Sequence, residues 1–308
     1  MSAKGSALKI LHVDTGREMR GGQHQVLLLA KGLHDHGHEN IVLARSGSPL
    51  FQAASGAGFE TESAGWTAIF RNSRRVDLVH VHDARGHTLA AGAARCPIVV
   101  SRRVAFPVRQ SLPSTWKYRR AARYLAVSRC VAAELSRAGI AEDKIDVIYD
   151  AVPDEVQPGI WDPRAPAVAL ASWDSQKGRD LVSAAAKLAG IEVNFSNDIP
   201  VSLRVASMFV YITRSEGLGS AALIAMAMGI PVVASRVGGL AEVFDDGTSG
   251  IHTDNTVEQI AAAMRKILQD GTLTALLIEN ARRLTTTRYS LHQLVSQTLT
   301  SYERALNG

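Results

Sequence analysis

Residues 215–242 read SEGLGSAALIAMAMGIPVVASRVGGLAE, and this stretch says most about how the chain folds. It holds a turn with Gly217 and Gly219, an apolar helix, a buried strand and a second glycine turn. A glycine turn that opens a helix leaves backbone N–H groups at the positive end of the helix dipole and therefore favours an anion. Glu216, in the same turn, would accept hydrogen bonds from hydroxyl groups. The stretch indicates either a phosphate site beside hydroxyl groups or an ordinary loop-to-helix junction of an α/β protein.

The composition is typical of a soluble globular protein with room for two domains. The chain has 308 residues, of which 46% are hydrophobic and 20% charged. Its two cysteines, Cys96 and Cys130, lack metal-type spacing, and so few cysteines indicate a reducing compartment. No signal peptide is evident, and the longest apolar run, residues 221–234, is too short to span a bilayer. These features predict a cytoplasmic protein.

Short apolar segments alternate with helical patterns along the whole chain. The alternation predicts parallel sheets, with strands over residues 8–13, 41–44, 76–81, 97–101, 124–127, 145–149, 167–171, 191–195, 208–212 and 232–234. Val26, Leu29, Ala30 and Leu33 fall on one face of a helix that Gly21-Gly22 opens. The last three helices are expected over residues 257–268, 272–284 and 291–306.

A loop rich in proline, with Pro153, Pro158, Pro163 and Pro166, interrupts this alternation. We therefore expect two Rossmann-like βα domains, residues 1–155 and 156–308, with the final helix packing back toward the first domain. The carboxyl ends of both sheets would face an interdomain cleft, where such folds bind ligands.

The basic residues are concentrated in one part of the chain. The net charge is +5, and residues 84–133 contain no Asp or Glu but ten basic residues: Arg85, Arg95, Arg102, Arg103, Arg109, Lys117, Arg119, Arg120, Arg123 and Arg129. Such a window attracts polyanions or is simply a solvated basic face. No nucleic-acid-binding motif accompanies it. Trp116 and Tyr118 flank Lys117, which favours an anionic membrane surface or an anionic lipid-linked acceptor over nucleic acid.

Several segments in order resemble the family-4 retaining glycosyltransferases of the GT-B fold. The resemblance covers most of the chain, and the nucleotide-sugar motif at residues 216–242 is its most specific part. The other segments are Gly21-Gly22 with its helix, VHVHD at residues 79–83, AVS at 126–128, residues 140–146, VIYDAV at 147–152, and Lys177-Gly178. The resemblance implies a GT-B fold whose second domain is shortened here, because little sequence separates Lys177 from Glu216.

The resemblance also implies an activity. It implies metal-independent transfer of a sugar from a nucleotide diphosphate sugar to a glycan or lipid-linked acceptor, with retention of configuration, without a cofactor. This role fits lipopolysaccharide or other cell-surface glycan synthesis, on the inner face of the plasma membrane. Lys177 and the N–H groups of Leu218 and Gly219 would neutralise the leaving diphosphate, and Glu216 would hold hydroxyl groups of the donor sugar.

The resemblance assigns the remaining site residues to the two substrates. On the donor side are Gly21, Gly22, Gly217 and Glu242, although Glu242 is expected mainly to brace its turn. On the acceptor side are His80, His82 and Arg102, and the two histidines are expected to line the cleft or end a strand rather than bind a metal. Arg103 takes the place of a catalytic-site His and is expected to meet a phosphate or an anionic acceptor.

Two further positions depart from the family pattern and leave alternatives open. Ile224 replaces the Glu that usually grips the ribose, and Ser172 replaces an Arg that usually binds the diphosphate. One alternative is a related enzyme with another donor, in which Arg102 or Arg103 supplies the missing charge. The others are a GT-B-like binding or scaffolding protein without turnover, and a sugar-nucleotide epimerase, for which no acid/base pair is identifiable.

Overall fold

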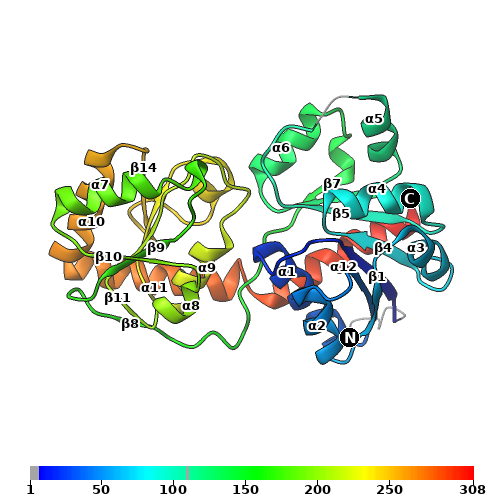
Figure 1. Cartoon of the computed structure of the whole chain (residues 1–308), viewed down its shortest axis with the longest axis horizontal. Helices are drawn as coiled ribbons and strands as arrows, with labels where there is room; N and C mark the ends of the chain where they lie inside the picture. Colours follow the sequence, from blue (N-terminus) through cyan, green and yellow to red (C-terminus); the bar gives the residue numbers. More distant parts are fainter. Residues whose placement is uncertain (1–6, 109–110) are drawn as a thin grey trace. The chain divides into compact units, whose positions relative to one another are not determined.

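The computed structural model describes residues 7–108 and 111–308 (Figure 1). The chain forms two compact units, Met1–Ile148 with Leu291–Gly308 and Tyr149–Ser290. The backbone N–H of Val152 donates to the carbonyl oxygen of Tyr289 at 2.8 Å. The prolines suggested a domain boundary at 155/156, but residues 149–155 fold with the second unit, and this bond is one of the contacts that join them to it.

The first unit is built on a seven-stranded parallel sheet in the order β3-β2-β1-β4-β5-β6-β7. The strands are β1 Lys9–Asp14, β2 Glu39–Ala44, β3 Glu60–Ser63, β4 Leu78–Val81, β5 Ile98–Arg102, β6 Arg123–Ala126 and β7 Ile145–Val147. From β1 the chain adds strands first on one side, toward β3, and then on the other side, from β4 onward. The strand order therefore reverses between β1 and β4, which makes their carboxyl ends the topological switch point of this sheet.

Seven α-helices complete the first unit in the part of the chain that the structure describes: α1 Gly21–Asp35, α2 Pro49–Gly56, α3 Trp66–Asn72, α4 Ala84–Ala93, α5 Leu112–Arg119, α6 Arg129–Arg137 and α12 Leu291–Asn307. The predicted apolar face of α1 is confirmed, because Val26, Leu29, Ala30 and Leu33 are all buried. Helix α12 packs against α1, β5 and β6. A Cβ atom at Gly32 would lie 2.6 Å from Val295, so the absence of a side chain there lets the two helices approach closely.

The second unit is built on a five-stranded parallel sheet in the order β10-β9-β12-β13-β14. Its strands are β9 Ala167–Leu170, β10 Val193–Ser196, β12 Phe209–Tyr211, β13 Val232–Ser235 and β14 Ile251–Thr253, and β8 Ile160–Trp161 pairs separately with β11 Val205–Ala206. Here the strand order reverses between β9 and β12. The second unit thus repeats the architecture of the first on a smaller scale, and the predicted α/β class with parallel sheets is confirmed.

The helices of the second unit are α7 Arg179–Ala189, α8 Ile199–Ser202, α9 Ser220–Met228, α10 Val257–Gln269 and α11 Gly271–Thr287. Helix α9, predicted from the apolar run, begins after Gly219 and ends before Gly229, and both glycines have positive φ angles, of 102° and 78°. Helices α7 and α10 pack together over a core that includes Val182, Ile260 and Met264. Within the described residues, we find no helix with the length and hydrophobicity that a membrane crossing requires.

Candidate active site

The second unit brings Lys177 and Glu216 together at its switch point. Lys177 ends a 3₁₀ turn, Ser175–Lys177, in the loop after β9, and Glu216 lies in the loop after β12. The Lys177 Nζ lies 2.7 Å from Glu216 Oε2, and the two side chains are 26% and 18% exposed. Two residues that are 39 positions apart in the sequence thus form one half-buried ion pair where α/β sheets bind ligands.

The Glu216 carboxylate has two further donors. The Tyr211 hydroxyl donates to Oε2 at 2.5 Å, and the backbone N–H of Gly217 donates to Oε1 at 3.1 Å. Burial, with the charge of Glu216 and their hydrogen bond, raises the pKa of Tyr211 well above its ordinary value, so the phenol keeps its proton. The carboxylate is therefore held in one orientation by a lysine, a phenol and a backbone amide.

The two glycine turns of the motif contact each other. The Glu216 carbonyl oxygen accepts from the N–H of Gly239 at 3.0 Å, and a Cβ atom at Gly238 would lie 2.4 Å from that oxygen. Among the described residues, the N–H groups of Leu218 and Gly219 donate to no protein acceptor. The turn before α9 therefore offers two backbone donors, as an anion site requires.

Glu242 lies at the end of the second glycine turn. Its carboxylate accepts from the Tyr149 hydroxyl at 3.2 Å, and its carbonyl oxygen accepts from the Tyr289 hydroxyl at 3.1 Å. These contacts tie the second glycine turn to the two ends of the unit. They support the bracing role that we expected for Glu242, and its contact with a donor stays a prediction.

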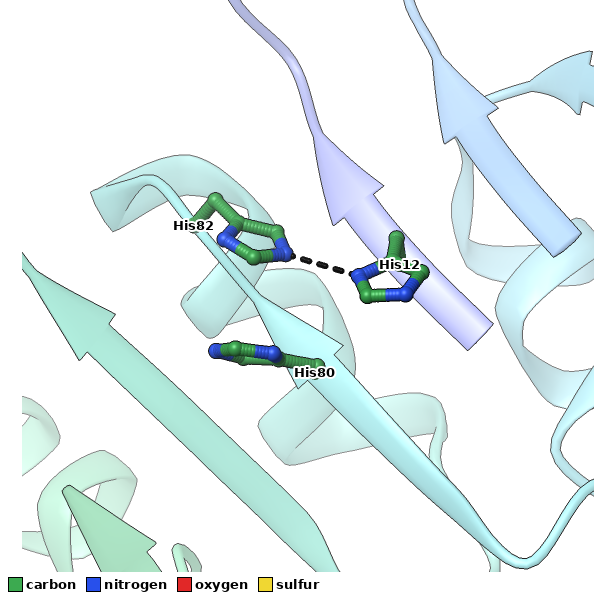
Figure 2. A group of neighbouring side chains, drawn as sticks. All are labelled: His12, His80 and His82. Carbon is green, nitrogen blue, oxygen red and sulfur yellow. Dashed lines mark hydrogen bonds between the residues drawn. The ribbon is translucent and has the colours of Figure 1, made fainter. Parts of the chain in front are cut away.

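The first unit gathers three histidines at its own switch point. His12 on β1 is the register partner of His80 on β4, and His82 follows β4 (Figure 2). His12 and His80 are fully buried, and His82 is 7% exposed. His80 thus lies within β4 and His82 directly after it, and their expected place on the acceptor side stays a prediction. His12 is a member of the cluster that sequence reasoning missed.

Hydrogen bonds fix the protonation of this histidine cluster, which comprises His12, His80 and His82. The Asn40 side-chain oxygen can only accept, so His12 Nε2, at 3.0 Å, carries the hydrogen. His12 Nδ1 must then accept from His82 Nε2 at 3.0 Å, which leaves His82 Nδ1 as an acceptor facing the Arg103 guanidinium at 3.4 Å. The result is a directional chain of hydrogen bonds from Arg103 through two imidazoles to Asn40.

The histidine cluster is uncharged. Burial lowers the pKa of His12 to about 4, and burial together with neighbouring positive charge lowers the pKa of His80 and of His82 well below the ordinary value. His80 bonds to the Tyr302 hydroxyl at 2.7 Å and to the Ser101 hydroxyl at 2.8 Å. Every ring nitrogen of the cluster thus has a protein partner.

The spacing of the cluster also admits a metal ion. One ring nitrogen from each histidine lies within 4.8 Å of the other two. However, a ligand nitrogen needs a lone pair that no hydrogen bond uses, and the Arg103 cation would repel a metal ion. The residues fit a hydrogen-bonded network better than a metal centre.

Arg103 lies beside the opening of α1. Its Cδ would be 3.7 Å from a Cβ atom at Gly22, which is an ordinary van der Waals distance, so the side chain packs beside the first turn of the helix. Gly21 is the first residue of the same helix. Arg102 faces another way, because it donates to the Tyr118 hydroxyl at 3.0 Å and to the Phe106 carbonyl. The first unit thus brings Gly21, Gly22, His82 and Arg103 together and uses Arg102 to hold the following loop.

Two family models match the chain, and their ranges include most residues of both switch points. The model of Glycosyltransferase Family 4 matches residues 19–156, and the model of Glycosyl transferases group 1 matches residues 180–284. The chain belongs to the family-4, group 1 glycosyltransferases. This family-4 chain also resembles solved structures over nearly its whole length, which shows the GT-B fold. HepE from Anabaena, solved with UDP and glucose, has a TM-score of 0.82 and 16% identity over 96% of this chain and 99% of that one. A glycosyltransferase from Rickettsia africae has a TM-score of 0.80 and 19% identity over 99% and 100% of the two chains.

Curated relatives match this family-4 chain over shorter stretches. A D-inositol 3-phosphate glycosyltransferase from Salinispora arenicola is 36% identical over 88 residues, which is 28% of this chain and 20% of the relative. The O-antigen chain mannosyltransferase B of Escherichia coli is 36% identical over 108 residues, which is 34% of this chain and 27% of the relative. The matches thus span only about a fifth to a quarter of these relatives' own length.

The structure corrects one member of the predicted basic face. Arg123 is buried on β6, where its guanidinium binds the Asp146 carboxylate of β7 at 2.7–3.0 Å. The face was expected to include Arg109, Lys117, Arg119, Arg120 and Arg123, and Arg109 lies outside the described residues. The remaining three belong to α5 and its end, and α5 has no buried residue.

Sequence reasoning also missed polar and aromatic residues around Lys177. Trp173 lies in the same loop and is 84% exposed, and Arg179 begins α7 directly after Gly178. Ser172, which replaces the family Arg, accepts from the N–H of Asp174 at 3.2 Å and so shapes this loop. The sequence signal that could have revealed them is an aromatic and a basic residue, Trp173 and Arg179, within eight positions of Ser172.

Proposed function

We propose that this chain transfers a hexosyl group from a nucleotide diphosphate sugar to an acceptor, with retention of configuration and without a metal ion. The observation that carries the proposal is the Lys177–Glu216 pair beside the two N–H groups of Leu218 and Gly219. Lys177 and these amides supply the positive charge that a leaving diphosphate needs. Retention rests on the family resemblance.

Lys177 binds the Glu216 carboxylate. A diphosphate that arrives would compete for the ammonium group and free the carboxylate to accept hydrogen bonds from sugar hydroxyls. Tyr211 and the Gly217 amide, which hold the carboxylate independently of Lys177, would keep it in place during this exchange. Binding of the two ends of the donor is thereby coupled.

The test is turnover with a panel of UDP-, GDP-, ADP- and CDP-sugars. A ligand at about 100 times its Kd adds roughly 2.7 kcal/mol of stability, so a thermal-shift screen selects the donor first. Release of the nucleoside diphosphate then measures the reaction, and the anomeric coupling constant of the product by NMR decides retention. Inversion, or a requirement for a divalent ion after extensive chelation, would contradict the finer parts of the proposal.

A non-catalytic binding protein is the second candidate, and the replaced positions favour it. The Ser172 hydroxyl accepts a hydrogen bond from the backbone of its own loop. Ile224 lies half-buried on α9, and its side chain supplies no carboxylate in place of the family Glu. Such a protein would bind the donor and neither transfer nor hydrolyse the sugar. Slow donor hydrolysis by the purified chain, abolished by Glu216→Gln, decides in favour of the enzyme.

We also propose that α5 and the segment around Phe106 face an anionic membrane or hold a lipid-linked acceptor for cell-surface glycan synthesis. Apolar side chains are exposed here beside basic ones: Phe106 61%, Leu112 88% and Trp116 52%, with Lys117, Arg119 and Arg120. Apolar insertion and roughly 1 kcal/mol per basic residue would combine, and salt would weaken the second term.

Vesicle co-sedimentation tests this membrane proposal. Binding to anionic vesicles should fall as ionic strength rises and should be lost when Lys117, Arg119 and Arg120 are all changed to Ala. Neutral vesicles and single-stranded or duplex nucleic acid are the controls. Equal binding of nucleic acid would show a general polyanion surface instead.

A further inference from the structure

The loop after β9 carries an exposed indole that is fixed by a cation. Trp173 is 84% exposed, and the guanidinium carbon of Arg179 lies 4.2 Å from the centroid of its ring. The same carbon lies 4.2 Å from the ring centroid of Phe195, on the neighbouring strand β10. Cation–π contacts to two rings thus tie the loop to the edge strand while most of the indole surface stays open to water.

These contacts are not those of a packed core. Phe195 is only half-buried, and Arg179 is half-exposed. In the described part of the chain, no protein acceptor takes a hydrogen bond from the Arg179 guanidinium, which carries five N–H donors. An open aromatic surface beside unused planar donors is a surface on which a flat, polar ring can stack.

The position of this surface relates it to the donor site. Trp173 is four residues before Lys177, and four residues reach at most about 14 Å when fully extended. The 3₁₀ turn and the bond from the Lys177 N–H to the Asp174 carbonyl oxygen, at 2.8 Å, shorten this distance. Trp173, Arg179 and Phe195 lie on the β10 side of Lys177, and Glu216 lies on its β12 side.

We propose that Trp173 and Arg179 form the stacking platform for the base of the nucleotide whose diphosphate contacts Lys177. This inference rests on the proposed function, since it takes Lys177 as the diphosphate contact. The donor then lies across the carboxyl ends of the strands with its sugar at Glu216, its diphosphate at Lys177 and its base on the β10 side. Arg179 then supplies a planar cation in the same loop region where Ser172 stands in place of the family Arg.

Calorimetry on matched ligands tests the platform. For whichever of UDP, GDP, ADP and CDP the unmodified chain binds best, affinities for the diphosphate and for its bare nucleoside are measured in Trp173→Ala and Lys177→Ala. Loss of one base-stacking contact should weaken both ligands by the same factor in Trp173→Ala, about 5- to 150-fold. Lys177→Ala should weaken the diphosphate alone. Because Trp173 is exposed, the Ala variant should keep its melting temperature.

Fluorescence gives a second readout that does not depend on truncation. The base should quench indole emission, and Trp173→Phe should remove that quenching with little loss of affinity, since Phe still stacks. The matched control is Trp66→Phe, which changes a 49%-exposed indole in the first unit and should keep the quenching.

The outcomes separate the platform from the proposed function. If the unmodified chain binds none of the four nucleotides, both are overturned. If the unmodified chain binds one of them, and Trp173→Ala binds both its diphosphate and its nucleoside as tightly as the unmodified chain does, only the platform is overturned. If Trp173→Ala weakens the diphosphate but not the nucleoside, the indole merely positions Lys177, and the stacking platform is again wrong.

Discussion

The two units share one sheet architecture but differ in the charge of the side chains at the point where the strand order reverses. Each has a parallel sheet whose strand order reverses once, between β1 and β4 in the first unit and between β9 and β12 in the second. At the first reversal lie three buried, neutral histidines beside Arg103. At the second lies the half-buried ion pair Lys177–Glu216. The same backbone geometry thus supports a rigid neutral network in one place and an exchangeable pair of charges in the other.

The difference shows which contacts a ligand can replace. Every ring nitrogen of the histidine cluster is bonded deep in the first sheet, so breaking one bond would leave a buried polar group without a partner. The Lys177–Glu216 pair is partly solvated, and an anion or a hydroxyl group can take the place of either member. The contrast therefore supports the proposal that the chemistry belongs to the second switch point, while the first holds Arg103 in position.

The largest expected effect concerns the neutrality of the histidine cluster. Folding lowers the pKa of such a His. At a pH between its folded and unfolded pKa values, the unfolded chain therefore binds a proton at this residue and the folded chain does not. The free energy of unfolding is therefore highest above about pH 6.5, and it decreases as the pH falls toward about 4, the folded-state pKa of His12. His12 alone contributes on the order of 3 kcal/mol to this loss.

Urea unfolding between pH 7 and pH 4 measures this dependence. His12→Gln should reduce the slope of the unfolding free energy against pH by about one proton, whatever its effect on stability at pH 7. A flat profile in the unmodified chain would show that the cluster is not held neutral.

Glu216→Gln should lower turnover by about 10² or more and weaken diphosphate binding far less. The amide can keep the contact with Tyr211 but loses the charge that pairs with Lys177 and orients the sugar. Steady-state kinetics with the donor found by screening, together with calorimetry on the diphosphate, separate the two effects. Unchanged turnover would remove Glu216 from the site and with it the contrast between the two switch points.

Lys177→Ala should weaken nucleoside diphosphate binding roughly 10- to 150-fold and leave nucleoside binding nearly unchanged. The estimate is the contribution of a charge-assisted contact, about 1.5–3 kcal/mol. Lys187→Ala, on the same unit and outside the site, serves as the control for the loss of a positive charge. Equal diphosphate affinity in both variants would mean that Lys177 is only a surface lysine.

The smallest effect is expected for Ile224→Glu. Ile224 is half-buried on α9, on the same side of the helix as Ser220, so a carboxylate there can stay hydrated. Nucleotide binding should be tighter or unchanged, and the melting temperature should change little. A large fall in melting temperature would reveal a buried, unpaired charge, which costs several kcal/mol, and would place Ile224 in the core.

The sequence predicted the parts of the fold that depend on local patterns. Helix α9, strand β13 and the glycine turns follow from apolar runs and from positions that need positive φ angles. Strand β3, with the sequence ETES, was not predicted, because nothing in a polar segment shows that it will pair with β2. Lys177 and Glu216 were found through a motif, although their contact joins loops 39 residues apart.

The rest of the site depends on tertiary contacts that a single sequence does not reveal. His12 looks like one polar residue in an apolar strand, and its role appears only when register places it beside His80. Arg123 was assigned to a basic surface because its partner, Asp146, comes 23 residues later on β7. Trp173, Arg179 and Phe195 meet only because β9 and β10 are neighbours.

Helix α12 gives the order of synthesis a structural meaning. The first unit is complete only when Leu291–Gly308 has joined it, after the whole second unit has been translated. Tyr302, fully buried, supplies one of the two partners of His80, and Arg304 and Ser301 bind Asp146. A nascent chain that has reached residue 290 therefore contains the whole sequence of the second unit, while α1, β5 and β6 of the first unit still lack the helix that packs against them. The second unit is therefore synthesised in full before the first unit has all of its residues.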